Sequence, residues 1–205
     1  YEMCGRDWSS DVCSSDLVYQ PSSAGFYYPV GTDAPSNVAI ALAQAAESDP
    51  TKVFVATPFY WAEPASANDL HLSAAGYEQV GMMWGKVLYK VVYRGEDWQP
   101  VQPVRITAYN STTIVVKFNV PEPPLVFDTT NVVDPGDYGF RVEDASGFVT
   151  ISSVTLVNED TVCIVTATPL GANPYLSYAY WAIGGNGTGP VIGARGNLQI
   201  GRAHV

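Results

Sequence analysis

Histidine, cysteine and basic side chains are scarce in this chain of 205 residues, which has 2 His, 3 Cys and 10 Lys and Arg against 20 Asp and Glu. The acidic excess gives a formal net charge of −10. Because phosphate binding requires clustered Lys and Arg, we expect no nucleic-acid partner. No group of His, Cys and carboxylate residues has the spacing of metal ligands, and the glycine-rich stretch 184–189 precedes no helix that would cradle a phosphate. We therefore predict neither a metal nor a cofactor.

Long apolar runs are absent as well. None approaches the roughly 20 residues that a membrane helix needs, so we expect no membrane partner. The sequence gives no expectation for the oligomeric state. For the cellular location, secretion and attachment to a phage particle are the two expectations.

The two ends of the chain have an unusual origin. Residues 1–17 (YEMCGRDWSSDVCSSDL) and 200–205 (IGRAHV) back-translate in open frames to the two strands of a sequencing adapter, so we interpret both flanks as artefacts. Removing 17 and 6 residues from 205 leaves 182. Because 2 of the 10 basic and 4 of the 20 acidic side chains lie in the flanks, 8 and 16 remain, with a net charge of −8. Cys163 is then the only cysteine, which excludes an intramolecular disulfide, and His71 is the only histidine.

A shift in composition near Pro100 divides the rest. Residues 18–93 contain an Ala-rich stretch, an apolar run and a long amphipathic segment, and this pattern is typical of an α/β domain. Residues 104–199 consist of β-branched and aromatic runs between turn residues, which predicts an all-β sandwich. The segment 94–103 between them has a charged turn and two prolines, which predicts a linker.

Local signals in the first part predict helix, strand and helix in succession. Asn37 can cap a helix that ends at Asp49-Pro50, and the apolar run 52–58 has the pattern of a parallel strand covered on both faces. Ser73 can cap a second helix, whose inner face is predicted from i, i+3, i+4 spacing to hold Tyr77, Val80, Gly81, Trp84, Leu88 and Val91. His71 then lies after the carboxyl end of a parallel strand, where open α/β sheets bind ligands.

The block 68–81, NDLHLSAAGYEQVG, resembles the last conserved block of the SGNH (GDSL-like) hydrolases, in particular carbohydrate esterases of the sialate O-acetylesterase type from phages and gut bacteria. The resemblance implies the C-terminal portion of a flavodoxin-like α/β/α fold. It also implies that His71 is the general base of a Ser-His-Asp triad and that a carboxylate orients it. We assign that carboxylate to Asp69. The family pattern puts the acid at the position of Asn68, which therefore remains the alternative orienter.

The nucleophile of such a triad is missing from the sequence, since no Gly-Asp-Ser or Gly-x-Ser-x-Gly motif occurs. The resemblance therefore implies a C-terminal fragment of a serine esterase that deacylates, and foremost deacetylates, a carbohydrate or acylated glycan, and we predict that this chain is inactive alone. Tyr19 and Gln20 match a Tyr-Gln pair of similar proteins, which makes them candidates for lining the cleft, but an ordinary position at a strand edge is the favoured interpretation. The alternative function is a noncatalytic carbohydrate-binding or phage structural module.

Five runs in the second part predict strands, namely 114–120, 138–142, 151–157, 161–165 and 175–180, and Asn158 to Asp160 predicts a tight hairpin turn. The region resembles accessory domains that follow SGNH hydrolases. Its aromatic residues Tyr175, Tyr178, Tyr180 and Trp181 could stack on sugar rings. Alternation puts Tyr178 and Tyr180 on one face, however, and this favours their burial in the sandwich.

Overall fold

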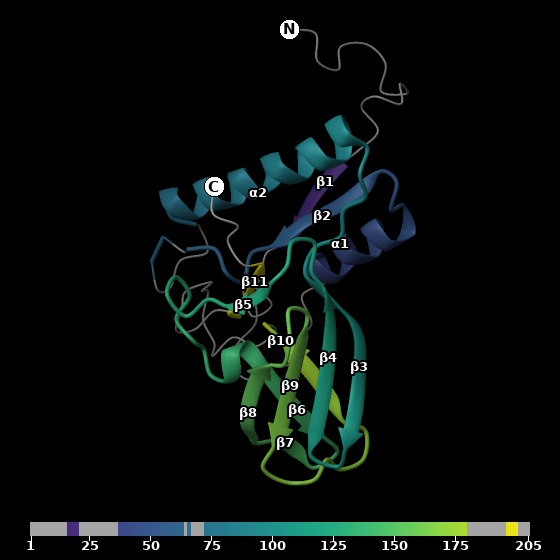
Figure 1. Ribbon diagram of the computed structural model, residues 1–205, viewed down its shortest axis with the longest axis vertical. Helices are drawn as coiled ribbons and strands as arrows, with labels where there is room; N and C mark the ends of the chain where they lie inside the picture. The colour runs from purple at the N-terminus through teal and green to yellow at the C-terminus, as the bar shows by residue number, and fades with distance from the viewer. Residues whose placement is uncertain (1–15, 21–36, 64, 67–71, 180–195, 201–205) are drawn as a thin grey trace, which may run out of the picture.

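Strands outnumber helices in the computed structural model of this chain, which describes residues 16–20, 37–63, 65–66, 72–179 and 196–200 (Figure 1). The α-helices are α1 (Asn37–Ser48) and α2 (Ala74–Leu88), with a π-helical segment Tyr89–Tyr93 and a 3₁₀ turn Asp137–Gly139. The strands are β1 (Asp16–Gln20), β2 (Val53–Pro58), β3 (Gln102–Asn110), β4 (Thr113–Asn119), β5 (Leu125–Phe127), β6 (Phe140–Asp144), β7 (Gly147–Val149), β8 (Ile151–Leu156), β9 (Thr161–Thr166), β10 (Tyr175–Tyr178) and β11 (Leu198–Ile200). No helix in these ranges is long and apolar enough to cross a bilayer.

The first two strands form a small parallel sheet. Val18 pairs with Val55, and Gln20 pairs with Pro58 at the carboxyl end of β2. The helices α1 and α2 lie on opposite sides of this pair (Figure 1). Phe54 and Ala56 project from one face of β2 into a cluster under α2, since successive side chains of a strand point to opposite faces.

The inner face of α2 differs in part from its prediction. Tyr77 and Leu88, predicted to face inward, are 55% and 43% exposed, while Val87 is fully buried. The inward side chains are Val80, Met83, Trp84, Val87 and Val91. Two stripes of i, i+3, i+4 spacing share Val80, Trp84 and Val91, so periodicity alone did not separate them. Packing against β2 selects the stripe that contains Val87.

The other strands are antiparallel. One sheet has the order β3-β4-β9-β8, a second has the order β10-β6-β7, and β11 pairs with β5. Both larger sheets contribute side chains to one core, whose buried members are Ile114, Val116, Phe118, Leu125, Phe140, Val142, Val149, Val162, Ile164 and Leu198. The predicted hairpin joins β8 to β9, where the Val157 amide donates to Thr161 O at 2.9 Å and the Asp160 amide to Asn158 Oδ1 at 3.1 Å.

The predicted fold class, a partial flavodoxin-like α/β/α fold followed by a β-sandwich, is wrong for this chain. In the described ranges the structure is β-rich, mostly antiparallel, and has only two α-helices. The helix-strand-helix pattern was interpreted as part of a larger parallel sheet, but β2 pairs with β1 alone among the described strands. Two backbone carbonyls of β2, those of Val55 and Ala56, accept hydrogen bonds from the indole N–H of Trp98, at 3.2 and 3.1 Å, and not from a further strand of the described ranges.

The predicted strands of the second part are confirmed as β4, β6, β8, β9 and β10, with ends shifted by a few residues. The strands β3, β5, β7 and β11 were not predicted. β3 begins at Gln102, inside the predicted linker, and β1 and β11 include Asp16, Leu17 and Ile200 from the predicted adapter flanks. The assignment of the flanks and of the domain limits stays a prediction.

Candidate functional site

The candidate site is the connection between the carboxyl end of β2 and the start of α2. Its described parts are residues 59–63, 65–66 and 72–73. The Ala62 amide donates to Phe59 O at 3.0 Å, which makes a turn directly after β2. Further along, the Ser73 amide donates to Glu63 O at 3.0 Å. Glu63 and Ser73 therefore close the connection into a loop with hydrogen-bonded ends.

The first turn of α2 holds the second end of this loop in place. Ser73 has extended backbone angles, φ −65° and ψ 169°, and its Oγ accepts a hydrogen bond from the Gly76 amide at 3.0 Å. This contact satisfies one of the free amides at the helix start. Gly76 packs so closely that a Cβ there would overlap the carbonyl oxygen of Glu63. Only glycine fits this position, and Leu72 beside it is buried.

The first end of the loop is fixed by aromatic side chains. Trp61 donates its indole N–H to Thr57 Oγ1 at 3.1 Å, across the end of β2. Tyr60 is 6% exposed and meets Tyr178 of β10 edge to face, with ring centroids 5.2 Å apart. Burial raises the pKa of Tyr60 far above its ordinary value, so its phenol is neutral at physiological pH. The loop is thereby joined to the antiparallel part of the molecule.

The predicted catalytic residues His71 and Asp69, and the alternative orienter Asn68, lie outside the described residues. Their roles stay predictions. Of the predicted cleft-lining residues, Tyr19 and Gln20 lie in β1, and the pairing of Gln20 with Pro58 brings its backbone to the end of β2 from which the loop starts. Their predicted role in lining a cleft stays a prediction.

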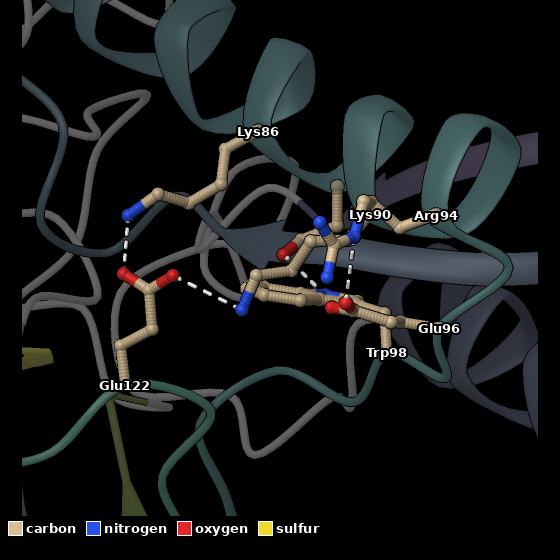
Figure 2. A network of polar contacts seen from close by, with 7 residues as sticks. Lys86, Lys90, Arg94, Glu96, Trp98 and Glu122 are labelled. Atoms are coloured by element: carbon tan, nitrogen blue, oxygen red, sulfur yellow. Dashed lines mark hydrogen bonds and ion pairs between the residues drawn. The ribbon is translucent and has the colours of Figure 1, made fainter.

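A second group of residues, which sequence reasoning missed, fixes the other end of α2 (Figure 2). Glu122 lies between the ammonium groups of Lys86 and Lys90 and pairs with both, with 3.1 Å from Oε1 to Lys90 Nζ. Partial burial acts to raise the pKa of Glu122, but the hydrogen bonds and charges of the two lysines outweigh it and lower the pKa. Lys90 Nζ also lies 5.5 Å from the ring centroid of the buried Trp98.

The signal for this group was present in the sequence but not specific. Lys86 and Lys90 are four residues apart, which puts them on one helix face. Their partners Glu122 and Trp98 are distant in the chain, so only the tertiary structure brings them together. Among the described residues, no three His, Cys, Asp or Glu side chains form a group that could hold a metal ion.

Comparison with known proteins found similarity among solved structures. A scan against protein-family models and a search of curated proteins gave no match. Among solved structures, the chain is similar to the crystal structure of a carbohydrate acetylesterase from Xanthomonas citri, with 19% identity and a TM-score of 0.48 over 74% of this chain and 30% of that one. The chain therefore spans less than a third of the length of that esterase.

Proposed function

We propose that this chain carries the histidine-bearing segment of a serine esterase of the SGNH type that removes acyl groups, foremost acetyl, from carbohydrate. The proposal starts from the sequence block 68–81, in which His71 and a neighbouring acid precede a Ser-x-x-Gly-Tyr helix start. Two described features support it. The second half of the block forms the start of a helix capped at Ser73, and the connection that leads to this helix begins at the end of β2.

The observation that carries the proposal is the hydrogen-bonded closure of this loop. The contact between the Ser73 amide and Glu63 O, at 3.0 Å, fixes the backbone two residues beyond His71 in the sequence. The close packing of Gly76 on Glu63 adds a second constraint. A general base must stay within hydrogen-bond reach of its nucleophile, so a loop that carries one gains from anchored ends.

In the proposed reaction, His71 takes the proton of a serine hydroxyl as the serine oxygen attacks the ester carbonyl. Collapse of the tetrahedral intermediate releases the sugar hydroxyl, which receives the proton from His71. Water then hydrolyses the acyl-serine, again with His71 as base, and releases the carboxylic acid. Asp69 orients the imidazole and stabilises its cationic form. No Gly-Asp-Ser motif occurs in these 205 residues, so we assign the nucleophilic serine to none of them.

The test is acetate release from p-nitrophenyl acetate and from acetylated xylan by the product of the full gene, including the coding sequence upstream of residue 18. His71→Ala should lower kcat/KM by roughly 10⁴-fold or more, because the base of a triad acts as a unit with its serine. Asp69→Asn and Asn68→Ala form a matched pair that identifies the orienter. We expect a large loss from the first and a small one from the second.

Two outcomes would remove the proposal. One is a full gene product with a Gly-Asp-Ser motif that does not hydrolyse either ester. The other is hydrolysis that is unchanged in His71→Ala. The 205-residue chain alone should release no acetate, and turnover by it would show that the nucleophile is a different residue of this chain.

A further inference from the structure

The outer face of α2 is apolar, like its inner face. On the inner face, Val87 packs in a cluster with Phe54 of β2, and the described helices and strands lie on that side of α2 (Figure 1). On the opposite side, exposed apolar residues and glycines recur every three or four residues, which places them on one helix face. The members of this outer stripe are Ala74, Tyr77, Gly81, Gly85, Leu88 and Val92. The helix thus has two apolar faces, and the described part of the chain covers one of them.

The outer stripe and its border form a contiguous apolar patch. Its large side chains on α2 and in the π-helical segment are between 43% and 63% exposed, and they are Tyr77, Met82, Leu88 and Val92. The stacked rings of Tyr89 and Tyr93, with centroids 6.1 Å apart, extend the same surface. Together these side chains expose on the order of 500 Å². A contiguous apolar patch of this size on a protein surface marks an interaction site.

Two glycines lie in the middle of the outer stripe. A Cβ added at Gly81 or Gly85 would have nothing within 4 Å apart from the backbone of the helix itself. Glycine inside a helix costs about 1 kcal/mol relative to alanine, and packing within the described part of the chain does not require it at either position. A helix without side chains at two successive turns allows a second backbone to approach closely. The centre of the stripe is therefore shaped for contact with another helix.

The charges of α2 leave this stripe apolar. The helix contains two charged side chains, Glu78 and Lys86. Lys86 pairs with Glu122 of the segment between β4 and β5, and Glu78 lies at the edge of the stripe. The centres of protein interfaces are depleted of charged residues in the same way. The net charge of −10 disfavours an anionic membrane surface, so the patch fits an apolar protein surface best.

The stripe is complementary to a second copy of itself. When two α2 helices pack antiparallel about the midpoint between Gly81 and Gly85, the glycines of the two copies face each other. Tyr77 of each copy then lies beside Leu88 of the other. The two Glu78 carboxylates are about 15 Å apart along the helix axis, which exceeds the Debye length of about 8 Å at physiological ionic strength. A parallel pair would instead bring the two carboxylates together, so charge favours the antiparallel arrangement.

We propose that the chain forms a reversible homodimer in which the outer stripes of two α2 helices pack antiparallel and cross at Gly81 and Gly85. The same patch serves both copies, as a two-fold axis requires. Two copies bury about 1,000 Å² in total, which is near the lower limit of a specific interface. We therefore expect a dissociation constant of roughly 10 to 100 µM, so that the chain is mainly monomeric below that range. The dimer does not depend on esterase activity.

The experiment is sedimentation equilibrium of the 205-residue chain from about 5 to 500 µM, a range that brackets the expected dissociation constant. The weight-average mass should rise from that of one chain towards that of two. Gly81→Leu is the decisive variant, because leucine adds apolar surface but prevents close approach of a second helix. It should weaken association 10-fold or more, whereas a face that is merely sticky would associate more strongly. Val92→Gln should weaken association roughly 3- to 10-fold through the loss of one apolar contact.

The matched control is Val157→Gln, the same substitution at a side chain that follows β8 and is 62% exposed. It should leave association unchanged, and Glu78→Gln should change it by less than about 3-fold, as expected for screened charges. The proposal is overturned if the mass stays at one chain or exceeds two, if Gly81→Leu associates as strongly as the original chain or more so, or if Val92→Gln and Val157→Gln behave alike. A larger effect of Glu78→Gln would overturn the antiparallel arrangement. Circular dichroism establishes that each variant is folded.

Discussion

Tyr60 meets Tyr178 edge to face, with ring planes at 87° and centroids 5.2 Å apart. Their hydroxyl groups share a hydrogen bond, and Tyr178 Oη also accepts from the Leu198 amide at 2.7 Å. Tyr60 follows β2, Tyr178 ends β10, and Leu198 begins β11. One chain of hydrogen bonds thus joins the candidate loop to two strands of the antiparallel part. Loss of one of these bonds should therefore destabilise both the loop and the strands.

Tyr60→Phe should lower the free energy of unfolding by about 1 to 2 kcal/mol, because the ring stays and the Tyr178 hydroxyl loses its buried partner. Urea denaturation followed by tryptophan fluorescence measures the change. Tyr109→Phe, on an exposed ring, is the control and should have no effect. An equal loss in both variants would contradict the role of the buried hydrogen bond.

The same tyrosines predict a loss of stability in alkali. Burial raises the pKa of both Tyr60 and Tyr178, so the folded protein keeps protons that the unfolded chain releases above about pH 10. The corresponding stabilisation is complete below that pH and decreases as the pH rises towards the folded-state pKa values. The free energy of unfolding should therefore fall steeply above about pH 10, and less steeply in Tyr60→Phe. Identical slopes would be inconsistent with this linkage.

Gly76→Ala should destabilise the protein by about 1 to 3 kcal/mol or more, because the new Cβ meets the backbone carbonyl of Glu63, which the Ser73 amide holds by a hydrogen bond. Gly81→Ala is a matched control on the same helix, with open space around the added methyl group. It should stabilise α2 by up to about 1 kcal/mol, the helix preference of Ala over Gly. Thermal unfolding of the two variants should shift in opposite directions. Equal shifts would show that the loop adapts to the methyl group.

Local signals predicted the elements around the candidate loop, because their causes are local. A capping serine, apolar spacing and a Pro-terminated strand suffice to place α1, β2 and the start of α2. The face of α2 was predicted less well, since two stripes share Val80 and Trp84 and only contact with β2 distinguishes them. The sequence block 68–81 was recognised by the identity of its residues rather than by their periodicity, and its second half forms the start of α2.

The fold class could not be predicted in this way, because it depends on which strands pair. The pattern of helix, strand and helix is compatible with a wide parallel sheet. In the structure Trp98, from the predicted linker, binds the carbonyls of Val55 and Ala56, and β2 has a single partner strand among the described residues. β3 was missed because its side chains are exposed almost throughout, so it lacks the alternation that marks a half-buried strand.

Glu122→Gln should cost about 0.5 to 1 kcal/mol at neutral pH, because it removes two ion pairs that solvent partly screens. The lysines lower the pKa of Glu122, so this stabilisation is present above the ordinary glutamate pKa of about 4.3 and is lost as the pH falls through the folded-state value. Urea denaturation should show the difference between the variant and the original chain shrinking in acid. Glu96→Gln, which breaks the more exposed pair with Arg94, should cost less. A difference that persists in acid would mean that packing, not charge, explains the effect.

Trp98→Phe should lower the free energy of unfolding by about 2 to 3 kcal/mol. The side chain is 6% exposed, and its indole N–H is the donor to two carbonyls of β2. Phenylalanine keeps an aromatic ring in the cluster but leaves those acceptors without this donor in a buried position. Lys90→Met is the control, because it removes the cation above the ring together with its pair to Glu122 and keeps an apolar stem, and it should cost only about 0.5 to 1 kcal/mol. Slow hydrogen exchange of the Trp98 indole N–H in the original chain would support the buried bond independently. Rapid exchange, together with a Phe variant of unchanged stability, would show that β2 does not depend on Trp98 and that another segment protects its edge.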